Sequence, residues 1–491
     1  MIMFFLRKKG PVIRERSEHC VSRKNIDEDA LKVLYRLSTE GHIAYLVGGS
    51  VRDLLLGRRP KDFDVGTNAR PNEIRKIFRN CFLIGRRFRL AHIIFGKKVI
   101  ETSTFRRQPQ ESEAANGLYQ AEDNTFGTPE EDSQRRDFTV NGLFYDIKTF
   151  SVIDYVGGLK DLDKKTLRCI GDPNIRFQED PVRMMRAVKF AARLDFTIDR
   201  ASRKAILKHH SEILKASAPR VCEEVYRLFT YNKSSEAFHL LWELTLLKDL
   251  LPELDKHIHT AGGKHALLWK ILQSLDTDPS AECASNGLRT ACLYYTVFLE
   301  QLKHEGAHAG HNKMNLPHAS RNALSSIAER LKIPKMTFFT AATILDLQRR
   351  FDELPSKGSR RFAHFVRHPD FLEALALYRI VQTAQKHDLS KANAWEAFFN
   401  EEWDAAHRHI DEEKANPESP EAVDPEAVFT VVAEDAPAKK PSSNTRRRSK
   451  RRGPPRKEHA SDHAPHAGHS ETPHTPSSTS HEHETKRSHH E

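Results

Sequence analysis

The pattern of apolar and polar residues divides the chain into two structured regions of different kind. Between residues 44 and 163, short apolar runs alternate with short helical patterns, which predicts a mixed α/β domain. A helical pattern from Asp27 to about Glu40 precedes this domain. The β-like runs are AYLVGG, DFDV, HIIF, KVIETSTF, RDFTVNGLFYD and FSVIDYV, and the helical runs are RDLLLG and PNEIRKIF.

The pattern changes after about Pro173, where the β-like runs end. Helical periodicity continues to about residue 410 and is interrupted by proline and glycine, so this region is expected to be all-helical. From about Glu412 the chain is rich in Pro, Ser, Glu, Lys, Arg and His and has too little apolar surface to offset the entropy of ordering. The predicted fold class is therefore α+β with a disordered basic C-terminal tail.

Two shorter segments carry no regular pattern. Residues 1 to about 25 are basic and are expected to be irregular. Residues 108–134 are polar, rich in acids and contain glycine, which predicts a mobile loop inside the α/β domain.

Composition adds a class of partner and a compartment. The 491 residues carry a formal net charge of +11, which favours a polyanionic partner, with nucleic acid as the leading candidate. The 6 cysteines are scattered without close spacing, so the sequence indicates neither a disulfide framework nor a zinc motif. No apolar run approaches the roughly 20 residues that span a bilayer. We therefore expect a cytoplasmic protein.

The segment KDFDV, residues 61–65, holds two aspartates two positions apart. If it is a strand, Asp62 and Asp64 project from one face, while the apolar residues point to the core. Two carboxylates on one face bind divalent metal, and nucleotidyl transfer by a two-metal mechanism requires ions about 3.5–4 Å apart. Taken alone, an Asp-x-Asp pair fits a solvated strand edge better than a metal site.

Such a metal site usually contains a third carboxylate from a neighbouring strand. Glu101 lies in the β-like segment 99–106 and is the best placed candidate, although alone it fits an exposed glutamate. Gly48 and Gly49 follow a predicted strand and precede a predicted helix, where bare backbone amides suit a phosphate. Arg52 lies one turn into that helix and adds charge, but two glycines are also common in a simple tight turn.

Five separated motifs resemble those of the class II nucleotidyltransferases, a family that comprises bacterial poly(A) polymerases and tRNA CCA-adding enzymes. They cover about residues 40–195 and follow the order of the family. The motifs are GGSVRD (48–53), KDFDV (61–65), RRDFTVN (135–141), DYVGGLKDL (154–162) and IGDPNIRFQEDPVRMMRAVKFAARL (170–194).

The resemblance implies a head, neck, body and tail architecture and assigns roles to residues. Asp62 and Asp64 would be metal ligands and Glu101 the third catalytic carboxylate, with two Mg²⁺ ions expected and Mn²⁺ as an alternative. The implied domains are a basic N-terminal extension (1–25), a catalytic head (26–165), a nucleotide-selecting neck (166–255), an RNA-binding body (256–411) and a disordered tail (412–491). The implied nucleotide-binding residues are Gly48, Gly49, Arg52, Arg136, Asp137, Asn141, Glu179, Asp180 and Arg183.

Within EDPVR, residues 179–183, the resemblance implies selection of the nucleotide. Pro181 at a first helical position would place Asp180 at the N-cap, with Arg183 on the same side. A carboxylate and a guanidinium held side by side can mimic a base-pairing edge. The same arrangement is also routine helix capping.

Other residues favour a poly(A) polymerase over a CCA-adding enzyme. The segment LIGRRFRLAHIIFG, residues 83–96, resembles a poly(A) polymerase signature that contains Arg86, Arg87, Arg89 and His92. Eight basic tail residues are typical of that subfamily and are expected to bind RNA: Arg446, Arg447, Arg448, Lys450, Arg451, Arg452, Arg456 and Lys457. If all of them met RNA phosphates, the affinity would fall roughly 10³-fold between 50 and 200 mM salt.

The sequence therefore predicts an enzyme that transfers AMP from ATP to RNA 3′ ends. A CCA-adding tRNA nucleotidyltransferase is the alternative enzyme, and use of CTP distinguishes it. An RNA-binding or scaffold protein without activity is an alternative of another class, although each required carboxylate is present. Asp-x-Asp alone also fits a two-metal nuclease, which has no use for the glycine turn together with EDPVR.

Overall fold

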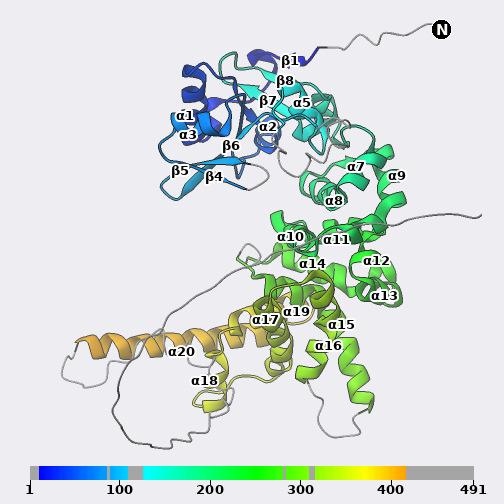
Figure 1. The fold of residues 1–491 in the computed structure, drawn as a ribbon. Helices are drawn as coiled ribbons and strands as arrows, with labels where there is room; N and C mark the ends of the chain where they lie inside the picture. Colours follow the sequence, from blue (N-terminus) through cyan, green and yellow to red (C-terminus); the bar gives the residue numbers. More distant parts are fainter. Residues whose placement is uncertain (1–9, 86–88, 109–124, 280–282, 309–315, 416–491) are drawn as a thin grey trace, which may run out of the picture. The chain divides into compact units, whose positions relative to one another are not determined.

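The computed structural model describes residues 10–85, 89–108, 125–279, 283–308 and 316–415. It contains a mixed sheet with helices in the N-terminal part and helices in the rest, so the predicted α+β class is confirmed (Figure 1). Disorder was predicted for residues 412–491, but residues 412–415 form the end of helix α20 (Ser390–Ala415), and residues 416–491 lie outside the described residues.

Eight strands form the main sheet. Neighbouring strands are antiparallel except for the central pair, β3 and β6, which run parallel. The spatial order is β1 (Val12–Arg14), β8 (Val152–Asp154), β7 (Leu143–Asp146), β2 (Ala44–Val47), β3 (Asp64–Thr67), β6 (Lys98–Thr104), β5 (Leu90–Phe95) and β4 (Cys81–Ile84).

The central parallel pair places the candidate carboxylates. Val65 pairs with Thr102, so Asp64 and Glu101 precede this pair on adjacent strands. Val65 and Thr102 are both fully buried, which fixes the register because a slip of one residue would expose an apolar side chain. The two carboxylates therefore lie side by side at the middle of the sheet.

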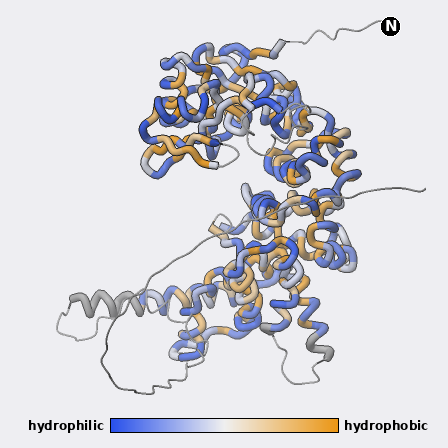
Figure 2. The backbone as a smooth tube through the Cα atoms, in the orientation of Figure 1, coloured by the Kyte–Doolittle hydropathy of each residue, from blue (hydrophilic) through white to orange (hydrophobic). Residues whose placement is uncertain are grey.

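Three helices pack around the strands of the head: α1 (Glu28–Thr39), α2 (Gly49–Leu55) and α3 (Pro71–Ile77). The carboxylate of Asp27 accepts hydrogen bonds from the backbone N–H of Asp29 and Ala30 at 2.9 and 3.3 Å, which caps α1. The apolar stripe of α1 is buried, as its periodicity predicts. Figure 2 shows apolar and hydrophilic residues alternating along the head and along the helical segments.

The remaining helices, apart from one described below, begin at the end of the head and continue through the helical region in sequence order. They are α6 (Gly158–Asp163), α7 (Pro173–Glu179), α8 (Val182–Leu194), α9 (Arg200–His209), α10 (Ala218–Arg227), α11 (Ser234–Glu243), α12 (Leu246–Leu250), α13 (Pro252–Thr260), α14 (Leu267–Thr277), α15 (Asn286–His308), α16 (Leu316–Leu331), α17 (Lys335–Leu347), α18 (Arg360–Val366), α19 (Phe371–Gln385) and α20 (Ser390–Ala415). None of the helices in the described ranges is long and apolar enough to cross a membrane.

Two segments expected to be irregular contain regular structure. Strand β1 pairs with β8 at the sheet edge, although it lies within the N-terminal segment 1–25. A strand of three residues that is half exposed carries too short an alternation to be recognised among basic residues. Helix α5 (Pro129–Gln134) lies within the expected loop, and its signal is the capping sequence TPEE: Thr128 accepts from the N–H of Glu131 at 3.3 Å.

A third difference concerns the helical region. Strand β10 (Thr197–Ile198) pairs in parallel with β9 (Thr166–Leu167), beyond the point where β signals were expected to end. Two residues are too few to give a periodic signal, and this pairing joins the end of α8 to the end of the head.

Candidate active site

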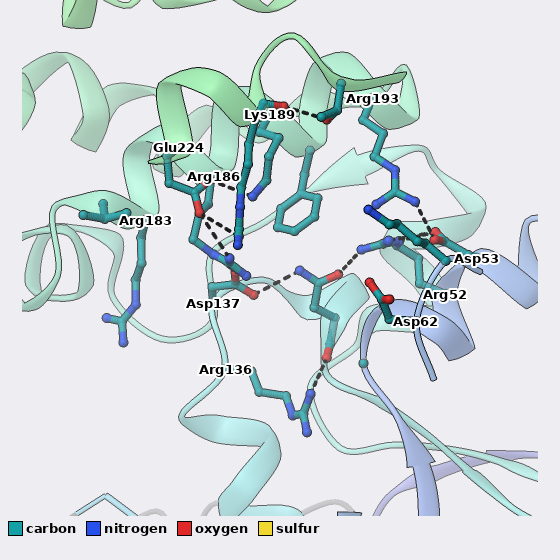
Figure 3. Close-up of a pocket in the computed structure, with 18 of the residues that line it drawn as sticks. Arg52, Asp53, Asp62, Arg136, Asp137, Arg183, Arg186, Lys189, Arg193 and Glu224 are labelled. Carbon is teal, nitrogen blue, oxygen red and sulfur yellow. Dashed lines mark hydrogen bonds and ion pairs between the residues drawn. The ribbon is translucent and has the colours of Figure 1, made fainter. Parts of the chain in front are cut away.

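A cavity of about 680 Å³ collects most of the residues implied by the family motifs. Its walls come from the head and from helices α8 and α10, as Figure 3 shows in part. Among the predicted site residues, those that line it are Gly48, Gly49, Arg52, Asp62, Asp64, Arg136, Asp137, Asn141, Asp180 and Arg183. Glu101 and Glu179 are not among the lining residues.

The two aspartates of KDFDV lie at the N-terminal end of strand β3. Asp64 begins β3, whereas Asp62 precedes the strand, so only one of them is a strand residue. Partial burial, the negative charge of Glu101 and that of Asp62 raise the pKa of Asp64 to about 6, against the opposing effect of Arg136. This crowding of negative charge around Asp64 is the environment that a divalent cation relieves.

Glu101 on β6 lies next to this pair but faces partly away from the cavity. Its side chain is 51% exposed, and its Oε1 lies 3.7 Å from Nε2 of His92 on β5. Glu101 is still near enough to raise the pKa of Asp64. Both Glu101 and Asp62 therefore lie close enough to Asp64 for their charges to act on it.

The oxygen donors fit a hard cation such as Mg²⁺, which prefers carboxylates together with water and substrate phosphates. Within the described ranges, no group of three or more His, Cys, Asp or Glu side chains is close enough to hold a metal ion without other ligands. A metal at Asp62 and Asp64 therefore requires substrate or water oxygens to complete its shell.

The glycine turn has a steric reason. Gly48 has φ 71°, and a Cβ at this position would lie 2.8 Å from Nη1 of Arg136. Any side chain would therefore strain the backbone and push Arg136 away. Arg136 is held in place by the buried carboxylate of Asp132, whose Oδ2 accepts from Nη2 of Arg136 at 2.9 Å.

Arg52 lies in the cavity wall but is almost completely buried. Its Nε donates to Oδ1 of Asp53 at 2.8 Å, and its Nη1 donates to Oδ1 of Asn141. Burial lowers the pKa of the Arg52 guanidinium, against the effect of Asp53. Arg52 therefore links α2 to the RRDFTVN segment, and its expected contact with triphosphate stays a prediction.

Asp137 is a buried carboxylate whose negative charge is balanced by Arg186. Burial by itself would raise its pKa, but the charge of Arg186 and hydrogen bonds from Asn141 and Arg186 lower the pKa to about 2. Nε of Arg186 donates to Oδ2 of Asp137 at 2.8 Å, and Nδ2 of Asn141 donates to Oδ1 at 3.0 Å (Figure 3). Asp137 therefore connects the head to α8.

The EDPVR residues do not make the direct pair that their spacing suggested. The predicted N-cap is wrong by one residue, because α8 begins at Val182 with Pro181 as its N-cap, and Asp180 is the C-cap of α7. Asp180 accepts from the N–H of Val182 at 3.3 Å, and its Oδ2 pairs with Arg220 of α10 at 3.0 Å. Arg183 donates to Oε2 of Glu179 at 3.1 Å. Both groups line the cavity, each fixed by another partner, while Glu179 holds Arg183 from outside it.

Several cations of the cavity were not identified from the sequence. Arg186, Lys189 and Arg193 follow a helical spacing along α8, and Arg220 and Arg227 come from α10. Burial and the charge of Arg186 lower the pKa of Lys189 to about 8, although its Nζ lies 2.6 Å from Oε2 of Glu224. The helical spacing of the basic residues of α8 is visible in the sequence and could have indicated their common face. The contribution of α10 depends on tertiary structure.

Some predicted residues cannot be placed. Arg86 and Arg87 of the poly(A) polymerase signature lie outside the described residues, as do the eight basic residues of the tail. His92 of that signature is described and contacts Glu101.

Three family models match the chain in order. "Poly A polymerase head domain" matches residues 44–168, "Probable RNA and SrmB-binding site of polymerase A" matches residues 195–258, and "Polymerase A arginine-rich C-terminus" matches residues 310–456. The first match covers the sheet and the carboxylates, and the second covers α10.

Individual relatives agree with these models. Poly(A) polymerase I of Salmonella typhi is 38% identical over 400 residues, which are 78% of this chain and 84% of the relative. The CCA-adding enzyme of Lactobacillus helveticus is 35% identical over 255 residues, or 52% of this chain and 60% of that enzyme. The likeness to the poly(A) polymerase thus extends farther along both chains.

The fold is also that of a solved relative. The structure of the Bacillus stearothermophilus CCA-adding enzyme in complex with CTP superimposes with a TM-score of 0.58 at 25% identity, and it covers 77% of this chain and 82% of that chain. Sequence and fold agree on one superfamily, and the longer sequence match selects the subfamily. The chain belongs to the poly(A) polymerase family of nucleotidyltransferases.

Proposed function

We propose that the chain polyadenylates RNA 3′ ends without a template, using Asp62, Asp64 and Glu101 as its catalytic carboxylates. The activity is polynucleotide adenylyltransfer, in which AMP passes from ATP to the terminal 3′-hydroxyl and pyrophosphate leaves. The observation that carries the proposal is the position of Asp62 and Asp64 in the lining of a cavity rich in Lys and Arg, with Glu101 beside Asp64 on the adjacent strand. Poly(A) polymerase I relatives support the choice of reaction.

In this proposal, the role of each cavity residue follows from its charge. Two Mg²⁺ ions bound by Asp62 and Asp64 would supply positive charge to the attacking and leaving oxygens. Arg136 lies against the glycine turn at Gly48, where its guanidinium would meet the triphosphate of bound ATP. The hydroxyl oxygen forms a new bond to the α-phosphorus while the bond to the pyrophosphate oxygen breaks.

Nucleotide choice belongs in this proposal to the neck, residues 166–255, and RNA binding to the body and the basic tail. Asp180 and Arg183 offer an acceptor and donors from fixed positions, because Arg220 holds the first and Glu179 the second. Fixed groups discriminate between bases better than mobile groups, since less ordering is required on binding. Because ATP and cellular transcripts are the proposed substrates, the proposed location of the enzyme is the cytoplasm.

A CCA-adding activity is the second candidate, because CCA-adding enzymes share the head motifs and the fold. The two reactions differ in nucleotide and product. The test is extension of a short unstructured RNA with each of the four NTPs separately. Long tails with ATP alone support polyadenylation, whereas equal use of CTP, or addition restricted to tRNA-like ends, supports the alternative.

Substitution of the carboxylates tests their assignment. Asp62→Asn and Asp64→Asn, separately, are expected to lower AMP incorporation at least about 10³-fold, because removing a ligand charge weakens metal-assisted stabilisation of the transition state. RNA binding and the melting temperature should stay near those of the wild-type protein. Asp163→Asn, an exposed carboxylate that pairs with Arg14 on the head, is the matched control. Activity retained in both variants would contradict the assignment.

A further inference from the structure

A second cavity, of about 600 Å³, adjoins the active-site cavity. Arg193, Thr230 and Tyr231 line both, so the two cavities are continuous. We call the second cavity the basic groove and define it by the five cations that line it: Arg58, Arg59, Arg193, Lys233 and Arg289.

The basic groove has a strongly one-sided charge. No aspartate or glutamate lies among its lining residues. Arg193 and Lys233 have carboxylate partners outside it, Asp53 at 2.7 Å and Glu236 at 2.7 Å. The groove therefore keeps a net positive charge, and a polyanion is the ligand that its electrostatic field favours.

An aromatic residue stands where the two cavities meet. The ring of Tyr231 is stacked under the guanidinium of Arg193, whose Cζ lies 3.8 Å from the ring centroid, and 47% of the residue stays exposed. An exposed ring with one face fixed by a cation offers a rigid surface on which a nucleobase can stack.

The backbone at this position is also unusual. Tyr231 has φ 69° and Asn232 has φ 54°, so two consecutive residues other than glycine adopt the left-handed region. Such a conformation is disfavoured for a bulky side chain and is found mainly where surrounding structure enforces it, often at binding sites. Here it projects the aromatic ring to the junction of the cavities instead of letting it join the core.

We propose that the basic groove holds the RNA strand that leads to the 3′ end, with a base next to the terminus stacked on Tyr231. The proposal rests on the proposed function and specifies where the RNA primer lies. ATP requires the carboxylates Asp62 and Asp64, which line the first cavity but not the groove, so the groove is left for the acceptor strand. Phosphate contacts with Arg58, Arg59 and Arg289 together with stacking make this grip independent of base sequence.

The test uses the full-length protein and a fluorescent unstructured RNA of about twelve nucleotides without ATP. Tyr231→Ala is expected to raise the Kd for RNA about tenfold, because stacking on one aromatic ring is lost. Tyr231→Phe keeps the ring and should bind as the wild type does. In the extension assay, Tyr231→Ala should raise KM for RNA while KM for ATP stays unchanged.

The salt dependence of RNA binding tests the contribution of the charges of the groove. Arg59→Ala should make the slope of log Kd against log salt shallower by about 0.7, the value for one phosphate contact on a single strand. Lys76→Ala removes the same charge from an exposed position on α3 outside both cavities and should leave the slope unchanged. Equal slopes for Arg59→Ala and the wild type would overturn the role of the groove.

Photocrosslinking locates the strand directly and independently of the basic tail. A 4-thiouridine next to the 3′ end should crosslink within residues 229–233. Crosslinks confined to other segments, or equal weakening by Tyr231→Ala and Tyr231→Phe, would refute stacking on Tyr231. If the wild-type protein incorporates no AMP while the groove variants still lose RNA affinity, the proposed function fails and the groove assignment stands.

Discussion

Asp154 belongs to one of the family motifs but has a structural role. It belongs to the family motif DYVGGLKDL, yet it is buried and lies away from the cavity. Its carboxylate accepts four backbone hydrogen bonds, from Val156, Gly157, Gly158 and Leu159, at 2.9 to 3.0 Å. The carboxylate thus links the end of β8 to the start of α6. The role of Asp154 in the motif is to hold this turn together.

Replacement of Asp154 by alanine should therefore destabilise the head without touching the chemistry. Four backbone N–H groups, two of them buried, would lose a charged acceptor, so the free energy of unfolding should fall by about 3 kcal/mol. Urea unfolding followed by circular dichroism measures this change. The control is Asp163→Ala, which removes an exposed carboxylate and should change stability by less than about 0.5 kcal/mol. Equal stability of the two variants would contradict the structural role.

At the scale of elements, the faces of α8 and α10 complete a site that the head begins. Helix α8 contributes Arg183, Arg186 and Lys189, and helix α10 contributes Arg220, which fixes Asp180. The ion pair joins residues 40 positions apart, so the position of the Asp180 carboxylate, for which we propose a role in nucleotide choice, depends on how α10 packs against α8.

Arg220→Ala should thus change which nucleotide is chosen more than whether transfer occurs. Asp180 would lose its partner and become mobile, and we expect the preference for ATP over CTP, as a ratio of kcat/KM values, to fall about five- to tenfold. Arg203→Ala breaks the exposed pair with Glu243 on the neighbouring helices and should leave the ratio unchanged. A ratio that is unaltered by Arg220→Ala would show that Asp180 does not need this support.

The elements also show what the sequence could and could not predict. The glycine turn, the Asp-x-Asp segment and the capping of α1 are local, so their residue types and spacing reveal them. The pairing of Asp180 with Arg220 and the stacking of Arg193 on Tyr231 are contacts between distant segments. A periodic pattern carries no information on such contacts, and strand β1 is too short to have a pattern at all.

At the scale of the whole molecule, the central parallel strands have a consequence for folding. Strands β4, β5 and β6 follow one another as an antiparallel meander and close short loops. The β3–β6 pairing instead joins residues 37 positions apart, such as Val65 and Thr102, and costs more loop-closure entropy. The meander is therefore expected to form first and then dock on β3.

The order of these events decides when the three proposed catalytic carboxylates come together. Asp64 and Glu101 reach each other only through the β3–β6 docking, so a folding intermediate with a complete meander has no site. Pulsed hydrogen exchange should show protection in β5 before protection in β3, and Mg²⁺ should leave the rate of the first step unchanged. Protection of β3 ahead of the meander would reverse this order. The late pairing of two distant strands thus brings Glu101 to Asp64 only at the last of these steps.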